Sequence, residues 1–169
     1  MNADAKPAPK TPLETATFGA GCFWGVEHTF AKLKGVKETA VGYEGGTVDN
    51  PTYKDVCTDR TGHAEVVQIK FNPKEIAYEK LLETFWTVHD PTQVNSQGPD
   101  YGTQYRTVIF THSPEQHKAA AKSRDALQNS AKYKTRRIAT QIVPAETFWA
   151  AEEYHQKYLQ KRGLDFCHF

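Results

Sequence analysis

Hydrophobic and polar residues alternate along some segments of this chain and recur at helical spacing along others. The clearest alternation covers residues 65–71, where Val67, Ile69 and Phe71 share one face with Glu65, as expected for a half-buried strand. The same criteria predict further strands over residues 15–19, 36–43, 106–111 and 138–143. They predict helices over residues 23–33, 73–88, 114–129 and 145–161.

The order of these elements indicates the fold class. Strands alternate with helices, but no helix is predicted between the strands at 36–43 and 65–71. This β-α-β-β-α-β order is typical of an α/β (α+β) two-layer sandwich with a mixed β-sheet and a ferredoxin-like core. Extra helices and a C-terminal tail complete the chain. We expect a single catalytic domain over residues 14–169, preceded by a disordered leader over residues 1–13, which has three prolines and no apolar signal-peptide segment.

Composition narrows the range of partners. The chain has 169 residues, of which 21 are basic and 20 acidic, so its net charge of +1 gives no reason to expect nucleic acid or a membrane surface as a partner. No stretch is long and apolar enough to span a bilayer. Three cysteines make a poor disulfide framework, and this favours a reducing, cytoplasmic setting without excluding a disulfide that forms during turnover.

The segment Gly19-Ala20-Gly21-Cys22-Phe23-Trp24-Gly25 is the strongest candidate for chemistry. Cys22 stands where the helical pattern begins, and the free N–H groups and dipole of a helix N-terminus stabilise an anion. A thiol in that position becomes a better thiolate nucleophile. The alternative is a cysteine buried in an aromatic core, but the flanking glycines favour close approach of backbone and substrate.

Glu65 is the second candidate, because it opens a strand on that strand's apolar face. Burial would raise the pKa of this carboxyl group and make it a useful general acid. A glutamate at a strand end that turns toward solvent is the alternative. Tyr43, Asp100 and Tyr105 lie in Gly-rich or Pro-rich loops and could present hydroxyl or carboxylate groups to a pocket. Each of these three is a weak signal alone.

Four motifs taken together resemble the peptide methionine sulfoxide reductase A family. They occur in the family's order and the resemblance covers roughly residues 15–169. The motifs are Gly21-Cys22-Phe23-Trp24-Gly25, Gly42-Tyr43-x-Gly45-Gly46, Thr61-Gly62-His63-Ala64-Glu65-Val66-Val67 and Asp100-x-Gly102-Thr103-Gln104-Tyr105-Arg106.

The resemblance implies roles for individual residues. Cys22 would attack the sulfoxide sulfur while Glu65 protonates its oxygen, leaving methionine and a cysteine sulfenic acid. Phe23 and Trp24 would hold the substrate methyl group. Tyr43 and Tyr105 would donate hydrogen bonds to the oxygen, and Asp100 would shape the site. The family's preference implies the S-epimer as substrate, in oxidised proteins or peptides and also as free methionine sulfoxide.

Recycling of the sulfenic acid is also implied by the resemblance. Cys167 matches the resolving cysteine, whose disulfide with Cys22 would then be reduced by thioredoxin. Apart from the resemblance, we expect a monomeric enzyme with no bound cofactor or metal. Leu164 and Asp165 replace glycines that the family usually has there, so a stiffer tail and slower recycling are expected. No cysteine follows Cys167 to act as a second relay.

Two other functions remain open from the residues alone. The first is acyl transfer by a Cys–His pair with Cys22 as nucleophile. The second is a non-catalytic peptide-binding domain that uses the aromatic residues. Cys57 is expected to be structural. His63 and His168 could suggest a metal together with a cysteine, but their spacing matches no common metal-binding pattern.

Overall fold

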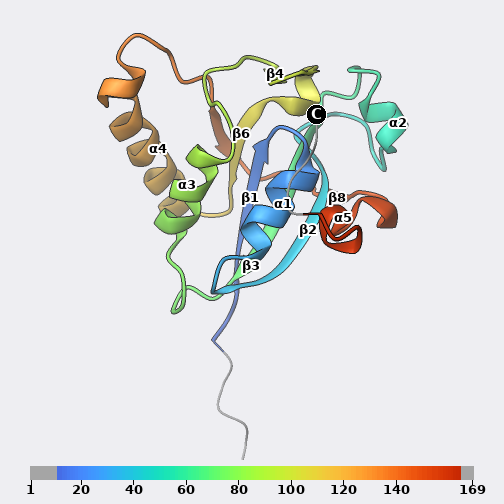
Figure 1. Ribbon diagram of the computed structural model, residues 1–169, viewed down its shortest axis with the longest axis horizontal. Coiled ribbons are helices and arrows are strands. Elements are labelled where there is room, and N and C mark those ends of the chain that lie inside the picture. Colours follow the sequence, from blue (N-terminus) through green and yellow to red (C-terminus); the bar gives the residue numbers. More distant parts are fainter. Residues whose placement is uncertain (1–10, 165–169) are drawn as a thin grey trace, which may run out of the picture.

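A mixed sheet of six strands forms the centre of the molecule (Figure 1). The computed structural model describes residues 11–164. The strands are β1 (Glu14–Ala20), β2 (Val36–Glu44), β3 (Ala64–Phe71), β6 (Thr107–Thr111), β7 (Gln141–Pro144) and β8 (Trp149–Ala150). Their order is β7-β6-β1-β3-β2-β8, and only the β6–β7 pair is parallel. The mixed sheet expected from the sequence is therefore confirmed.

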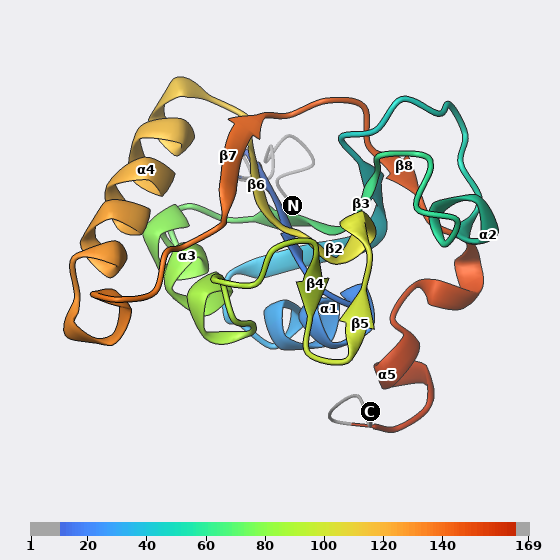
Figure 2. The ribbon, with the colours of Figure 1, turned by 90° about the horizontal axis from the view of Figure 1, so that it is seen from above.

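Four of these strands and two helices form the expected β-α-β-β-α-β core. The helices are α1 (Phe23–Ala31) and α3 (Tyr78–Thr87), and the four strands lie in the order β6-β1-β3-β2. The longer helix α4 (Pro114–Gln128) packs beside α3 (Figure 2). Shorter pieces complete the chain, namely α2 (Tyr53–Val56), α5 (Tyr158–Lys161), the hairpin of β4 (Ser96–Gln97) and β5 (Asp100–Tyr101), and 3₁₀ turns at Thr103–Tyr105, Ala131–Tyr133 and Glu153–His155. Within residues 11–164, no helix is long and apolar enough to cross a membrane.

Strand alternation divides the buried residues between the two faces of the sheet. The main core lies between the sheet and helices α1 and α3, where Phe18 of β1 stacks on Phe30 at 5.3 Å and on Phe85 at 5.1 Å between ring centroids. A smaller cluster on the opposite face contains Val66 and Val108, with the segment around residues 145–148 packed against it. Glu65 points to the helix side because it alternates with Val66.

Two predicted boundaries move in the structure. The helix expected from residue 73 begins at Tyr78, because Asn72 first closes a turn: its carbonyl accepts the N–H of Ile76 at 3.0 Å and its side chain accepts that of Lys74 at 2.9 Å. The last long strand begins at Gln141 rather than at residue 138. The predicted start of α4 is confirmed, since the side chain of Ser113 accepts the N–H of Gln116.

The helix predicted over residues 145–161 is wrong. Instead, β8 pairs with β2, a 3₁₀ turn follows, and α5 is only four residues long. Lys157 adopts the left-handed region with φ of 52°, which interrupts helical geometry. Hydrogen bonds to the rest of the fold therefore override the helical propensity of this segment. Gly163 ends α5 as expected, with φ of 65° and the N–H of Leu164 bonded to the carbonyl of Leu159.

Candidate active site

The turn between β1 and α1 places Cys22 at the start of the helix. Cys22 is the N-cap residue of α1 and is half-buried. Gly21 before it has φ of +93°, and a Cβ atom there would lie 2.8 Å from Cγ of Gln97 in β4. Glycine is therefore required at this position for both its conformation and its size. The predicted location of Cys22 at a helix N-terminus is confirmed.

The side chain of Glu65 lies at the same helix N-terminus. It is 2% exposed, and its Oε1 accepts the N–H of Phe23, the first residue of α1, at 3.3 Å. Its Oε2 is buried and has no hydrogen-bond partner within the described residues. The pKa of Glu65 is raised to about 8, mainly because the group is buried and also by the charge of Asp100, while the Phe23 N–H opposes the shift. The carboxyl group is therefore mostly protonated near pH 7 and can donate a proton.

These two groups share a cavity of about 350 Å³. Six residues expected at the site from the sequence line it together, although they come from α1, β3, the β4–β5 hairpin and the turn before β6. They are Cys22, Phe23, Trp24, Glu65, Asp100 and Tyr105. Burial raises the pKa of Asp100 and, together with the nearby carboxylates, that of Tyr105, so the Tyr105 hydroxyl remains a donor at neutral pH.

Tyr43 does not line this cavity. It is fully buried, its ring lies 5.9 Å from that of Phe23, and its hydroxyl donates to Glu152 at 3.0 Å. Tyr53, at the start of α2, lines the cavity instead. The sequence carried a signal for this position, since the Thr52-x-x-Asp55 pattern is a capping box that starts a helix at Tyr53.

The C-terminal segment supplies the rest of the cavity lining, which the sequence did not predict. Tyr158, Leu159 and Leu164 form this part, called here the C-terminal wall. Tyr158 stacks on the indole of Trp24 with centroids 3.8 Å apart and planes 8° from parallel. The Trp24 indole N–H donates to Nδ1 of His155 at 2.9 Å. Trp24 is thus fixed from two sides by residues about 130 positions later in the chain.

The other two cysteines lie in different situations. Cys57 is exposed at the end of α2, and partial desolvation together with the carboxylates of Glu65 and Glu152 raises the pKa of its thiol. A raised pKa lowers the fraction of thiolate, which argues against a reactive role for Cys57, whereas the structural role expected from the sequence has no support from this exposed position. Cys167 lies outside the described residues, and Leu164, three residues before it, lines the Cys22 cavity.

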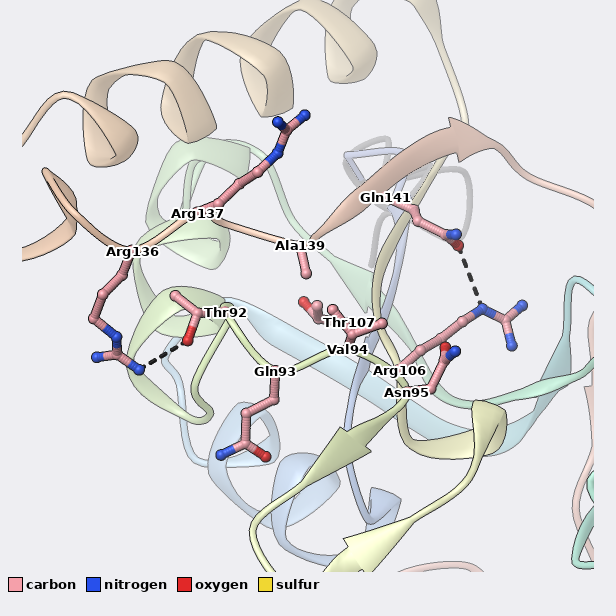
Figure 3. Close-up of a pocket in the computed structure, with 10 residues that line it drawn as sticks. All are labelled: Thr92, Gln93, Val94, Asn95, Arg106, Thr107, Arg136, Arg137, Ala139 and Gln141. Carbon is pink, nitrogen blue, oxygen red and sulfur yellow. Dashed lines mark hydrogen bonds between the residues drawn. The ribbon is translucent and has the colours of Figure 1, made fainter.

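A second cavity, of about 600 Å³, lies near the loop before β4 and the strand β7 (Figure 3). Its arginine side chains point in different directions: Arg136 pairs with Asp90 at 2.8 Å, and Arg106 donates to Gln141 at 3.3 Å. Among the residues that the structure describes, no thiol or carboxyl group lines it. Over residues 11–164, no three His, Cys, Asp or Glu side chains are grouped so that they could hold a metal. Of these two cavities, only the one at Cys22 therefore has both a thiol and a carboxyl group among its described lining residues.

Comparison with known proteins identifies the family. The model of the family "Peptide methionine sulfoxide reductase" matches residues 14–169. The chain belongs to the peptide methionine sulfoxide reductase family. It is therefore an oxidoreductase that reduces methionine sulfoxide. The peptide methionine sulfoxide reductase MsrA of Acidobacterium capsulatum is 65% identical over 156 residues, covering 92% of this chain and 99% of that protein. The peptide methionine sulfoxide reductase MsrA of Methanoculleus marisnigri is 60% identical over 160 residues, covering 95% of this chain and 97% of that protein.

Solved structures of reductases have the same fold. Reduced Mxr1 of Saccharomyces cerevisiae superposes with a TM-score of 0.85 at 38% identity, covering 97% of this chain and 93% of that one. Methionine sulfoxide reductase A of Corynebacterium diphtheriae superposes with a TM-score of 0.86 at 37% identity, covering 95% of this chain and 79% of that one. Mxr1 in complex with Trx2 superposes with a TM-score of 0.61 at 28% identity, covering 92% of this chain and 91% of that one.

Proposed function

We propose that this reductase acts on the S-epimer of methionine sulfoxide, free or within proteins, in the Cys22 cavity. One observation carries the proposal: a buried carboxyl group that holds its proton near pH 7 lies at the helix N-terminus where the thiol of Cys22 stands. A thiol nucleophile and a neutral acid side by side are what cleavage of an S–O bond requires. The S-epimer preference comes from the family resemblance.

The reaction consumes one proton and transfers one oxygen atom. The thiolate of Cys22 attacks the sulfoxide sulfur and forms an S–S bond, while Glu65 gives its proton to the sulfoxide oxygen. The resulting hydroxyl group then passes from the substrate sulfur to the sulfur of Cys22, as the substrate S–O bond and the S–S bond both break. Methionine leaves, and the oxygen ends on Cys22 as a sulfenic acid, so sulfur of the substrate is reduced and sulfur of the enzyme is oxidised. Glu65 is returned to its neutral form by a proton from solvent.

The cavity lining matches the two halves of a sulfoxide. Phe23 and Trp24 offer an apolar surface to the S-methyl group, and Tyr158 stacked on Trp24 extends this surface. Tyr53 and Tyr105 offer hydroxyl donors to the oxygen. We assign to Tyr53 the role that the family resemblance implied for Tyr43, because the Tyr43 hydroxyl is bonded to Glu152 outside the cavity lining.

The sulfenic acid is resolved by Cys167 in this proposal. The thiol of Cys167 attacks the sulfenic sulfur, water leaves, and a Cys22–Cys167 disulfide forms, which a dithiol protein such as thioredoxin then reduces. Support comes from chain length: Leu164 lines the Cys22 cavity, and the three residues from there to Cys167 can span about 10 Å. The similarity to Mxr1 in complex with Trx2 supports thioredoxin as the reductant.

Acyl transfer by a Cys–His pair has less support. Within residues 11–164 no histidine lines the cavity, and Nδ1 of the nearby His155 already accepts the Trp24 indole N–H.

The three cysteines favour a cytoplasmic enzyme, because the cytoplasm keeps thiols reduced.

A reductase assay on each epimer tests the proposal. With dithiothreitol, methionine should form from the S-epimer and not from the R-epimer. Without reductant, the wild type should release about one methionine per enzyme and then hold a Cys22–Cys167 disulfide detectable by peptide mapping. Cys167→Ser should still give the first methionine and then stall with thioredoxin. Normal turnover of Cys167→Ser with thioredoxin would rule out Cys167 as the resolving residue.

A further inference from the structure

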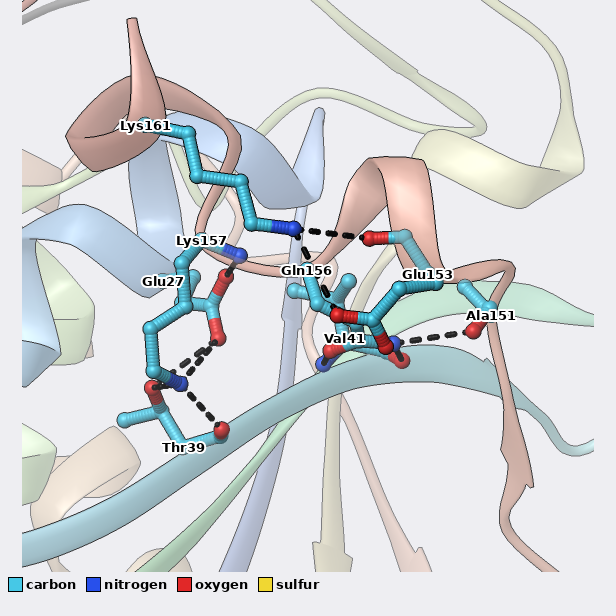
Figure 4. A network of polar contacts seen from close by, with 8 residues as sticks. All are labelled: Glu27, Thr39, Val41, Ala151, Glu153, Gln156, Lys157 and Lys161. Atoms are coloured by element: carbon cyan, nitrogen blue, oxygen red, sulfur yellow. Dashed lines mark hydrogen bonds and ion pairs between the residues drawn. The ribbon is translucent and has the colours of Figure 1, made fainter. Parts of the chain in front are cut away.

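The C-terminal wall depends on contacts outside its own helix. α5 has only four residues, too few to be stable alone, yet it carries Tyr158 and Leu159 of the wall. Its position against α1 must therefore be fixed by specific bonds. Figure 4 shows the network that provides them, between α1, β2 and the start of α5.

Glu27 of α1 is the centre of this network. Its side chain is 2% exposed. Oε1 accepts the backbone N–H of Lys157 at 2.6 Å, and Oε2 accepts the hydroxyl of Thr39 at 2.9 Å and lies 3.5 Å from Nζ of Lys157. One buried carboxylate thus joins three elements, and all of its partners are donors.

The backbone at Lys157 is arranged to reach Glu27. Its left-handed conformation, φ of 52°, turns the chain from the preceding 3₁₀ turn into α5. Its Nζ also donates to the carbonyl of Thr39 at 2.8 Å. The neighbouring Gln156 holds the same segment to β2, because its amide pairs with both the N–H and the carbonyl of Val41 at 2.9 Å.

We propose that Glu27 is a positioning residue, which docks the C-terminal wall against the helix that carries Cys22 and so sets the shape of the sulfoxide cavity. Glu27 does not line that cavity. It lies on the same helix as Trp24, and its partner Lys157 directly precedes Tyr158, which stacks on Trp24. Loss of the Glu27–Lys157 contact therefore loosens the Trp24–Tyr158 stack. The effect on substrate rests on the proposed function, whereas the docking itself does not.

The substitution Glu27→Gln tests the role of the carboxylate. An amide places an NH₂ donor against a site where every partner is a donor, so at least one hydrogen bond to a charged group is lost. The substrate concentration that gives half of the maximal single-turnover rate should rise about 10- to 100-fold, as expected for that loss. The maximal single-turnover rate, which reports the chemistry at Cys22 and Glu65, should stay within about twofold.

A second measurement needs no substrate. Hydrogen exchange of the amides in residues 158–164 should be faster in Glu27→Gln than in the wild type, while exchange in β1 and β3 stays unchanged. Glu153→Gln is the matched control, because the Glu153 side chain makes an exposed ion pair with Lys161 in the same segment (Figure 4), whereas Glu27 bonds to Lys157 and Thr39. Glu153→Gln should change neither the exchange of residues 158–164 nor the substrate concentration that gives the half-maximal rate.

A Glu27→Gln variant with normal exchange in residues 158–164 and a normal substrate dependence would overturn the proposal. A lower maximal rate with an unchanged substrate dependence would also overturn it, because Glu27 would then act on the chemistry.

If Glu27→Gln does not fold, Lys157→Met decides, since it removes only the ammonium group of a half-exposed side chain. It should shift both quantities in the same direction by a smaller factor, and no shift would overturn the proposal. Faster exchange in Glu27→Gln, together with a wild-type protein that reduces neither epimer of methionine sulfoxide, would support the docking role and refute the proposed function.

Discussion

The two sides of the Cys22 cavity are built in different ways. Cys22 and Glu65 stand at the ends of α1 and β3, and both elements belong to the main core, where most side chains are fully buried. The C-terminal wall stands on a four-residue helix that is held by side-chain bonds to the backbone of β2 and to α1. The proposed reacting groups thus lie on elements of the main core, whereas the wall is held by polar contacts of its flanking residues and by the stack of Tyr158 on Trp24.

This difference separates two tasks. Proton transfer needs the thiol and the acid at a fixed distance, and regular secondary structure provides that. Substrate entry and the approach of a resolving cysteine need a surface that can move, and we expect a four-residue helix held by polar contacts of its flanking residues to open at a lower free energy than the core. Substitutions on the rigid side should therefore change the chemical rate, and those on the other side should change substrate binding and recycling.

Loss of the nucleophile should have the largest effect. Cys22→Ser should abolish methionine formation even with excess dithiothreitol, because a hydroxyl group does not replace a thiolate as the oxygen acceptor. Cys57→Ser is the matched control and should keep most of the activity, since Cys57 is exposed and does not line the cavity. Substantial turnover by Cys22→Ser, measured as methionine released, would contradict this assignment.

Removal of the acid should have the second largest effect on the rate. Glu65→Gln keeps the shape of the side chain and its bond to Phe23 but loses the proton, so the single-turnover rate should fall about 10²- to 10⁴-fold. Affinity for substrate should change much less. Rapid-quench measurement of methionine at saturating substrate gives this rate directly, and a decrease below tenfold would show that Glu65 is not the general acid.

The two cavity tyrosines should have smaller effects. Tyr53→Phe and Tyr105→Phe each remove one hydroxyl donor, and each should lower the single-turnover rate about 2- to 13-fold, the value of one hydrogen bond. Tyr43→Phe is the control, because its hydroxyl is bonded to Glu152 and not to the cavity. If Tyr43→Phe lowered this rate more than Tyr53→Phe did, the assignment of Tyr53 would be wrong.

The smallest change in the chemical rate is expected for Gln156. Gln156→Ala leaves the N–H of Val41 without its partner and removes one of the two donors to the Val41 carbonyl, which still accepts the N–H of Ala151, so the free energy of unfolding should fall by about 1–3 kcal/mol. The substrate concentration for half-maximal rate should rise, while the maximal single-turnover rate stays close to that of the wild type. A large loss of that maximal rate would show that the two sides of the cavity are not separable.

The sequence predicted the rigid side of the cavity well, because its signals are local. The alternation over residues 65–71 placed Glu65 on the core face, and the helical spacing after Cys22 located the start of α1. Both were confirmed because burial follows directly from the period of the pattern.

The C-terminal wall of the cavity could not be predicted in the same way. Residues 145–161 contain many helix-forming residues, but hydrogen bonds from Gln156 to Val41 and from Lys157 to Glu27 link positions more than 100 apart in the chain. Such long-range contacts decide the structure of this segment and leave no periodic signal. Tyr43 was expected at the site for its Gly-rich motif, yet strand pairing directs its ring into the core beside Glu65.

The pH dependence of the single-turnover rate tests the central claim most directly. Burial raises the pKa of Glu65 to about 8, and a general acid works only while protonated, so the wild-type rate should fall as the pH rises through about 8. The much slower Glu65→Gln variant should lack this decrease, because its side chain does not titrate. A wild-type rate that stays constant or rises to pH 9.5, or the same decrease in both proteins, would contradict the account.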